Sequence, residues 1–367
     1  MTFPTQPEAI QQRLEAVDPA AYAKTRNYLN GAVTRLSPYL SRGVLSTYDV
    51  MQHLQERRYQ FYEVEKLLQE LAWRDYWQWL WNLHGENINQ DLLRLQPGVQ
   101  HHQMPSAVLH AQLGIEVLDD AIHQLYGTGY IHNHLRLYLA GTICTIGKTH
   151  WHTPAQWMYY HLLDGDWASN ALSWQWVAGT ASSKPYFANQ ENINKYSGST
   201  QRKTFLDADY SELTTAAAPL LFSKAEALSL QTHLPTTAMS AVDESLPTLL
   251  YTYYNLDPTW MADVKANRIF ILEPHVFAKY PVSDRCIEFA TALANNIEGI
   301  QIFTGSFASL QHRFPNNHFH FKQHPLNAYF SGEAHPRKTL AEPPQARCAF
   351  FPFWKHTVKQ IKKEWPH

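Results

Sequence analysis

The stretch 164–180, which reads Asp-Gly-Asp-Trp-Ala-Ser-Asn-Ala-Leu-Ser-Trp-Gln-Trp-Val-Ala-Gly-Thr, constrains this chain more than any other. Asp166, Asn170 and Trp174 recur every four residues, so a helix here places all three on one face. The simplest interpretation is a helix N-terminus followed by core aromatics. It does not explain why an amide and two tryptophans share one short element. A planar, redox-active ligand does, because it needs apolar walls and polar groups at its edge.

Composition limits the class of protein. The 367 residues are enough for two domains, and 45% are hydrophobic, which allows a large core. The net charge of −2 gives no overall attraction for nucleic acid, which binds where basic groups neutralise phosphates. Three distant cysteines without metal-ligand spacing fit a reducing compartment. Without a signal-peptide pattern or an apolar run long enough to span a membrane, we expect a cytoplasmic protein.

The hydrophobic pattern changes along the chain. Residues 1–205 show helical spacing and predict a mainly α-helical domain. Residues 206–246 are rich in Ala, Ser, Thr and Pro and predict a linker that contains a short helix at 223–230. Residues 247–367 predict a small α/β domain with a parallel, Rossmann-like sheet. Its expected elements are strands at 248–254, 268–272, 300–304 and 318–322, a helix after Ser283, and a basic amphipathic helix at 354–363.

Three histidines, His318, His320 and His324, fall on one side of the last expected strand. A metal site is one interpretation, but a polar strand face is favoured, and no metal ligands are predicted.

The motif at 164–180 resembles the signature of the photolyase/cryptochrome flavoproteins, DGDxAxN followed by WQWxAGT. Further stretches match that family in order over roughly residues 22–207. The resemblance implies a helical domain that binds FAD noncovalently. In the family a smaller α/β antenna domain usually comes first, so residues 247–367 resemble a displaced antenna domain. That segment has neither a Walker loop nor GxGxxG, so no antenna chromophore can be named.

The segment 34–46, Thr-Arg-Leu-Ser-Pro-Tyr-Leu-Ser-Arg-Gly-Val-Leu-Ser, resembles the family loop that holds the FAD diphosphate, with Tyr22 upstream. Hydroxyls and backbone N–H groups before a helix suit phosphate, although an ordinary Ser/Thr cap is the alternative. Val33 replaces the first threonine of the family pattern.

The segment 70–77, Glu-Leu-Ala-Trp-Arg-Asp-Tyr-Trp, resembles the family's ELxWRxFY. Helical spacing puts Glu70, Trp73 and Arg74 on one face. The alternative interpretation is a solvated Glu–Arg pair beside a buried tryptophan. The resemblance implies that Glu70 and Trp73 line a lesion-binding cavity and that Arg74 lies at the cofactor.

The segment 129–140 resembles the family's GWxHNRxRM. The resemblance implies that Asn133 contacts flavin and lesion and that Arg136 pairs with Asp164, which fits the need of a buried arginine for a carboxylate. Two independent surface charges are the alternative. Tyr130, His134 and Leu137 depart from the pattern, as does Ala188, where photolyases carry an arginine that grips DNA.

Tryptophans at 151 and 174 match the middle and proximal members of the family's electron-transfer chain. No aromatic residue stands near Gly98, the distal position, so Tyr130, Trp157 or Tyr159 substitutes or the chain is shorter. Core packing of Trp151 is the alternative.

We therefore predict a photolyase-like lyase that uses light to transfer an electron from FAD to pyrimidine dimers, binding damaged or single-stranded DNA weakly and no membrane. A cryptochrome-like sensor or redox flavoprotein without repair activity is the alternative. The predicted catalytic residues are Glu70, Trp73, Asn133, Trp151, Trp174 and Trp176. The predicted cofactor-binding residues are Tyr22, Thr34, Arg35, Leu36, Ser37, Arg74, Asn133, Arg136, Asp164, Asp166 and Asn170.

Overall fold

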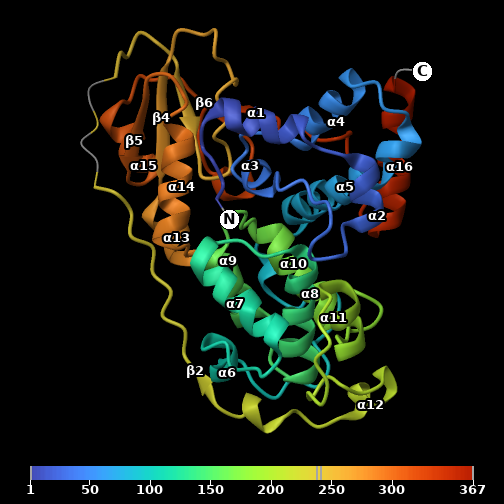
Figure 1. Ribbon diagram of the computed structural model, residues 1–367. Coiled ribbons are helices and arrows are strands. Elements are labelled where there is room, and N and C mark those ends of the chain that lie inside the picture. The colour runs from blue at the N-terminus through green and yellow to red at the C-terminus, as the bar shows by residue number, and fades with distance from the viewer. Residues whose placement is uncertain (1, 237–238, 240–241, 366–367) are drawn as a thin grey trace. The chain divides into compact units, whose positions relative to one another are not determined.

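The computed structural model describes residues 2–236, 239 and 242–365 (Figure 1). The chain divides into two compact units, each built from separate segments. The helical unit contains Ala21–Val33 and His84–Leu230. The sheet unit contains Thr2–Ala20, Thr34–Leu83 and the chain from Gln231 onward. The division into domains at 1–205, 206–246 and 247–367 stays a prediction, and each unit is described by itself below.

The helical unit consists almost wholly of short helices, as its hydrophobic spacing predicts. Its elements, with α2 reaching back into the preceding segment, are α2 Pro19–Thr25, the 3-10 turn Gly85–Asn89, β1 Met104–Pro105, α6 Ser106–Leu109, α7 Glu116–Thr128, α8 Asn133–Gly141, the π-helical turn Thr142–Ile146, α9 His152–His161, α10 Trp167–Ala178, α11 Gln190–Ser197, α12 Tyr210–Thr215, the 3-10 turn Leu220–Phe222 and β2 Ala225–Glu226.

The predicted helix at 223–230 is wrong. Ala225 and Glu226 form a short strand that pairs antiparallel with Met104 and Pro105. The backbone N–H of Ser106 also donates to the carbonyl of Lys224 at 2.9 Å. The segment therefore satisfies backbone groups across the chain, where a helix would have satisfied them locally.

The sheet unit combines helices from the N-terminal part of the chain with a parallel sheet. Its elements are α1 Pro7–Glu15, α3 Ser37–Ser41, α4 Thr47–Glu56, α5 Phe61–His84, β3 Thr248–Tyr251, β4 Asn267–Leu272, α13 Pro274–Lys279, α14 Asp284–Ala294, β5 Ile300–Thr304, α15 Phe307–Arg313, β6 Phe319–Lys322, the 3-10 turn Pro325–Asn327, β7 Glu333–His335 and α16 Phe350–Glu364.

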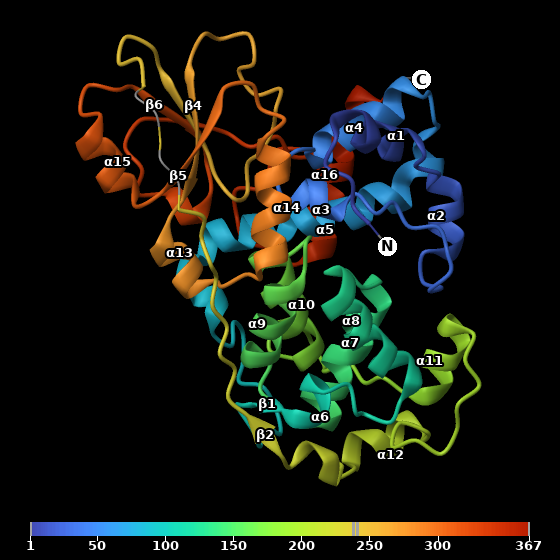
Figure 2. The ribbon, with the colours of Figure 1, turned by 60° about the vertical axis from the view of Figure 1, so that its left-hand side comes forward.

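The sheet has five parallel strands in the order β5-β4-β3-β6-β7. The predicted fold class, a mainly helical protein with a parallel-sheet α/β part, is confirmed, as are the four expected strands and the helix after Ser283. Figure 2 shows α14 on one side of the sheet and α15 on the other. Right-handed crossovers require this, because the step from β4 to β5 and the step back to β6 run in opposite directions.

The hydrophobic side chains on both faces of this sheet are buried, as expected for parallel strands. One face carries a core in which Leu250, Ile269 and Ile271 pack against Phe307 and Leu310 of α15. Leu249, Tyr251, Phe270 and Leu272 are buried as well, with the alternate spacing that belongs to the other face.

Helix α16, which includes the predicted basic helix, packs on α5 through aromatic rings. Phe350 stacks on Trp73 with ring centroids 3.4 Å apart and planes 8° apart. Phe353 meets Tyr76 and Trp79 at 5.3 and 5.4 Å. Across the described part of the chain, no helix is both long enough and apolar enough to cross a bilayer.

Candidate functional site

The segment 164–180 forms a tight turn that leads into α10. Asp166 caps the helix by accepting a hydrogen bond from the backbone N–H of Ser169 at 2.8 Å, and Gly179 ends the helix with a φ of 86°. A Cβ on Gly165 would approach the carbonyl oxygens of Leu162 and Tyr159 to 2.9 and 3.0 Å. Glycine is therefore needed between the two aspartates because the backbone turns against itself there. The helix N-terminus interpretation describes Asp166 correctly, and the structure adds a separate role for Asp164.

Asp164 and Arg136 form the ion pair that the resemblance implied. Nη2 of Arg136 lies 2.8 and 3.0 Å from the two carboxylate oxygens. The Asp164 side chain is 3% exposed and that of Arg136 is 21% exposed. The arginine also donates from Nε and Nη2 to the carbonyl of Ile131, which fixes the turn before α8. The interpretation as two independent surface charges is therefore wrong.

The two sequence motifs that contain this pair also contain two asparagines, which belong to the same unit. Asn133 is the first residue of α8 and is exposed. Asn170 is half-buried on α10, and its side-chain Nδ2 donates to the carbonyl of Ala155 at 2.8 Å. That bond orients the amide with its oxygen as the remaining acceptor. The helical unit thus carries one exposed and one half-buried asparagine, together with an ion pair whose carboxylate is buried.

The predicted diphosphate loop belongs to the sheet unit, whereas Tyr22 lies on α2 in the helical unit. The hydroxyl of Thr34 accepts a hydrogen bond from the N–H of Leu36 at 3.4 Å, and Arg35 adopts a left-handed φ of 54°. Ser37 then begins α3. Leu36 is buried, so its contribution to a ligand could come only from its backbone.

The predicted lesion-binding face of α5 carries other contacts. Glu70 forms an ion pair with Lys66 at 2.8 Å, and Nη2 of Arg74 donates to the hydroxyl of Ser41 at 3.0 Å. One face of the Trp73 ring is covered by Phe350 of α16.

The three tryptophans of the helical unit differ in exposure. Trp151 is fully buried and its indole N–H donates to Asp91 at 2.7 Å. Trp174 is also buried, whereas Trp176 is 38% exposed. The suggested distal substitutes, Tyr130, Trp157 and Tyr159, are all buried, so none offers the solvent-exposed end that an electron-transfer chain requires.

Two departures from the family pattern have structural consequences. His134 stacks against the rings of Tyr138 and Tyr196, with ring centroids 5.3 and 4.9 Å apart. Burial lowers the pKa of His134, and the charge of Arg26 lowers it further, against a hydrogen bond with the backbone of Asn27 that raises it. The ring is therefore neutral near pH 7 and does not supply a cation for phosphate. Ala188 is fully buried, so an arginine introduced there would not reach DNA without rearrangement.

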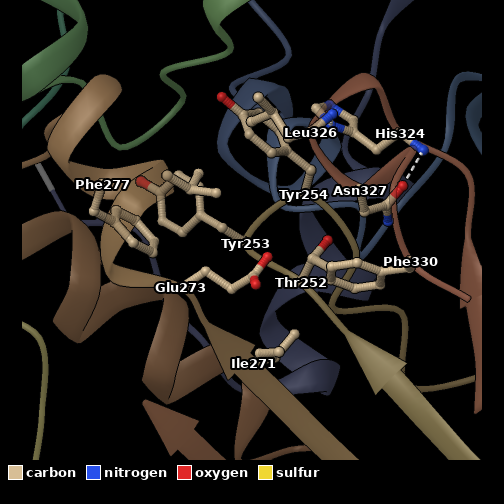
Figure 3. Close-up of a pocket in the computed structure, with 11 residues that line it drawn as sticks. Thr252, Tyr253, Tyr254, Ile271, Glu273, Phe277, His324, Leu326, Asn327 and Phe330 are labelled. Carbon is tan, nitrogen blue, oxygen red and sulfur yellow. Dashed lines mark hydrogen bonds between the residues drawn. The ribbon is translucent and has the colours of Figure 1, made fainter. Parts of the chain in front are cut away.

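Sequence reasoning missed a pocket in the sheet unit at the carboxyl ends of β3, β4 and β6 (Figure 3). β3 has β4 and β6 on its two sides, so the strand order reverses here, the usual ligand position in open α/β sheets. The pocket is lined by Thr252, Tyr253, Tyr254, Ile271, Glu273, Val276, Phe277, His324, Leu326, Asn327 and Phe330. Glu273 accepts hydrogen bonds from the N–H of Phe307 at 2.6 Å and from the Tyr329 hydroxyl. The signal in the sequence was the Glu-Pro pair that ends β4.

Comparison with known proteins agrees with the motifs. Residues 67–217 match the family described as the FAD binding domain of DNA photolyase. This stretch is similar to the FAD-binding domain of photolyases and cryptochromes. The deoxyribodipyrimidine photo-lyase of Alkalihalophilus pseudofirmus is 27% identical over 158 residues, which cover 42% of this chain and 33% of that protein. Cryptochrome DASH of Gloeobacter violaceus is 29% identical over 167 residues, which cover 43% of this chain and 33% of that protein.

The chain spans about a third of the length of these curated relatives. Among solved structures, a cryptochrome from Synechocystis sp. is 25% identical with a TM-score of 0.48, covering 53% of this chain and 44% of that one. A class III photolyase from Agrobacterium tumefaciens is 23% identical with a TM-score of 0.46, covering 52% and 42% of the two chains.

Proposed function

We propose that this chain binds FAD noncovalently and acts as a light-driven electron-transfer protein. The observation that carries the proposal is the Arg136–Asp164 pair, in which a buried carboxylate holds a largely buried guanidinium in the first turn of α8. A buried ion pair is costly to maintain unless it serves a specific arrangement. Here it fixes the turn that presents Asn133.

The residues of the helical unit fit a flavin dinucleotide in their chemistry. Asn133 and Asn170 offer amide groups to a polar ring edge, and the Arg136 guanidinium suits a ring carbonyl or a phosphate. Tyr22, Asp164 and Asp166 complete the proposed cofactor residues of this unit. The resemblance also assigns to the cofactor Thr34, Arg35, Leu36, Ser37 and Arg74, which belong to the sheet unit.

A bound FAD would supply the light-absorbing, redox-active group, while the protein supplies orientation and apolar surroundings. Trp174 and Trp151 are buried, and their indole rings are the easily oxidised groups that we propose carry electrons. The Trp151 indole donates its N–H to Asp91, and this carboxylate stabilises positive charge on the ring.

The proposed electron acceptor is a pyrimidine dimer in damaged or single-stranded DNA. Trp176 and Asn133 are exposed and therefore accessible to an extruded base, and Glu70 and Trp73 are the further lesion residues that the resemblance assigns. With a net charge of −2, a neutral His134 and a buried Ala188, we expect weak binding that depends strongly on salt.

A second candidate function, a redox or sensory flavoprotein that does not repair DNA, is favoured by the stack of Phe350 on Trp73. A ring pair 3.4 Å apart leaves no room for a base on that side of the indole. Repair would then need the other face of Trp73, or displacement of Phe350.

The absorbance spectrum of the purified protein tests flavin binding: a colourless protein that also fails to take up added FAD would refute the proposal. Repair is tested with the reduced, FAD-loaded protein, dimer-containing oligonucleotides, blue light and low salt. We expect dimer splitting that falls in Glu70→Ala and Trp176→Ala but not in Tyr210→Ala, a control at a residue 48% exposed on the same unit as Trp176. Flavin binding without dimer splitting would select the second candidate.

A further inference from the structure

Three side chains with metal-binding groups converge on the last two strands of the sheet. Nδ1 of His320 lies 3.1 Å from Nε2 of His335. The Glu333 carboxylate lies 3.6 Å from His320 Nδ1 and 3.5 Å from His335 Nε2, through different oxygens. One ligand atom from each residue can be chosen so that all three lie within 4.8 Å of one another.

The strand register produces this cluster. In the register of these parallel strands, His320 on β6 lies opposite Glu333 on β7, and Lys322 lies opposite His335. Alternation along β6 turns Phe319 and Phe321 into the core, so the other two residues of the strand project from the opposite face. β7 has only three residues and lies at the sheet edge, where it pairs with β6 alone.

The spacing suits a tetrahedral ion. Metal–nitrogen and metal–oxygen bonds of about 2.0–2.2 Å at tetrahedral angles separate two ligand atoms by roughly 3.3–3.5 Å. The two imidazole nitrogens are 3.1 Å apart, and each lies 3.5–3.6 Å from one oxygen of Glu333, so small side-chain rotations would bring one carboxylate oxygen and both nitrogens to that spacing. Two neutral imidazoles and one carboxylate also form a ligand set that zinc-class ions prefer.

The charges around the cluster favour a cation. The nearest basic group along β6, Lys322, is paired with Asp257 at 2.7 Å, so its positive charge is offset. The imidazoles of His320 and His335 are 17% and 25% exposed, and Trp260 packs against the His335 ring with centroids 5.7 Å apart. The Glu333 side chain, 67% exposed, leaves the cluster open to water on one side.

We propose that His320, Glu333 and His335 bind one divalent transition-metal ion of the zinc class. Water completes the coordination, as in sites with three protein ligands. The ion joins two neighbouring strands and so stabilises β7 at the sheet edge. The three histidines singled out in the sequence are not the ligand set: His318 is exposed, and His324 is buried, where it stacks on Tyr254 with centroids 4.4 Å apart.

The test is a calorimetric titration of the chelator-treated full chain with Zn²⁺ at pH 7.5, repeated with Co²⁺ to record its visible absorption bands. We expect one Zn²⁺ site per chain whose affinity exceeds that of any other site on the chain. Its affinity should be at least tenfold weaker in His320→Gln and in His335→Gln. His318→Gln, an exposed histidine beside the same strand, is the matched control and should bind as the wild type does. Acid should weaken binding because protons compete for both imidazoles.

Glu333→Gln guards against variants that fail to fold, because this side chain is exposed and its amide preserves the shape. We expect it to weaken Zn²⁺ binding and to reduce the rise in melting temperature that saturating Zn²⁺ gives the wild type. Absence of a one-to-one site, or equal affinity in the wild type and all three ligand variants, would overturn the proposal. The cluster would then be only a hydrogen-bonded histidine pair beside a carboxylate.

Discussion

Replacing Arg136 with alanine tests the role of the buried pair most directly. The substitution removes the guanidinium that contacts both oxygens of Asp164, a side chain only 3% exposed. Breaking a buried pair by removing one partner costs about 3–5 kcal/mol, because the remaining charge is left uncompensated. Since the Arg136 side chain is 21% exposed and its pair is thus partly solvated, we expect the lower end, about 3 kcal/mol.

The assay is urea unfolding followed by circular dichroism, together with the ratio of flavin to protein after purification. Arg202→Ala is the matched control: its contact with Asp207 in the same unit is 3.6 Å long and the arginine is 67% exposed. Such surface pairs contribute less than about 1 kcal/mol.

A double variant separates the charge effect from lost packing. Adding Asp164→Asn to Arg136→Ala removes the buried carboxylate that has lost its arginine, so the double variant should be more stable than the single one. The argument from charge burial is wrong if Arg136→Ala unfolds no more easily than Arg202→Ala. It is also wrong if the double variant is destabilised by the sum of the effects that Arg136→Ala and Asp164→Asn have singly.

Three further substitutions give separate expectations. Burial raises the pKa of Asp75 to about 6 despite hydrogen bonds from Leu340 and Thr47. Between about pH 4 and 6 the folded protein therefore keeps this proton while the unfolded chain has lost it. The free energy of unfolding should fall as pH rises through that window, by up to about 3 kcal/mol. Asp75→Asn should remove this pH dependence, as measured by urea unfolding at a series of pH values. Trp174→Phe keeps the volume but removes the oxidisable indole, so bleaching of FAD by blue light with an external reductant should slow greatly, and an unchanged rate would point to another route. Phe350→Ala should destabilise the sheet unit by about 3 kcal/mol and increase binding of dimer-containing oligonucleotides, whereas Phe351→Ala, at a side chain 69% exposed, should change neither.

Local chemistry made much of the helical unit predictable. The four-residue spacing of Asp166 and Asn170 predicted a helix whose first turn is acidic, and the structure adds that Asp166 is the cap itself. The family resemblance implied that Arg136 pairs with Asp164 across 28 residues, and the need of a buried arginine for a carboxylate supported it. Such inferences work where one group's charge or backbone geometry demands a particular partner.

Register and packing between distant segments were not predictable in the same way. β7 is three residues long, polar and preceded by glycine, so nothing in its pattern distinguished it from a loop. The cluster of His320, Glu333 and His335 exists only because β7 pairs with β6 in one particular register, and a shift by one residue would reverse its side chains. The helix expected at 223–230 failed for the same reason, since pairing with β1 overrode local preference.

The contact between Trp73 and Phe350 decides how far family resemblance can be carried over to function. The motif around Trp73 matches the lesion-binding helix of photolyases, yet the ring that covers it comes from α16, outside the matched stretch of residues 67–217. Aromatic stacking contributes only about 0.5–1.5 kcal/mol beyond the area that it buries. Extruding a base from DNA costs a few kcal/mol of unstacking energy, which contacts with the protein would also have to offset. Occupation of Trp73 by Phe350 is therefore a handicap for repair but none for flavin binding, and it makes α16 the element whose position separates the two proposed functions.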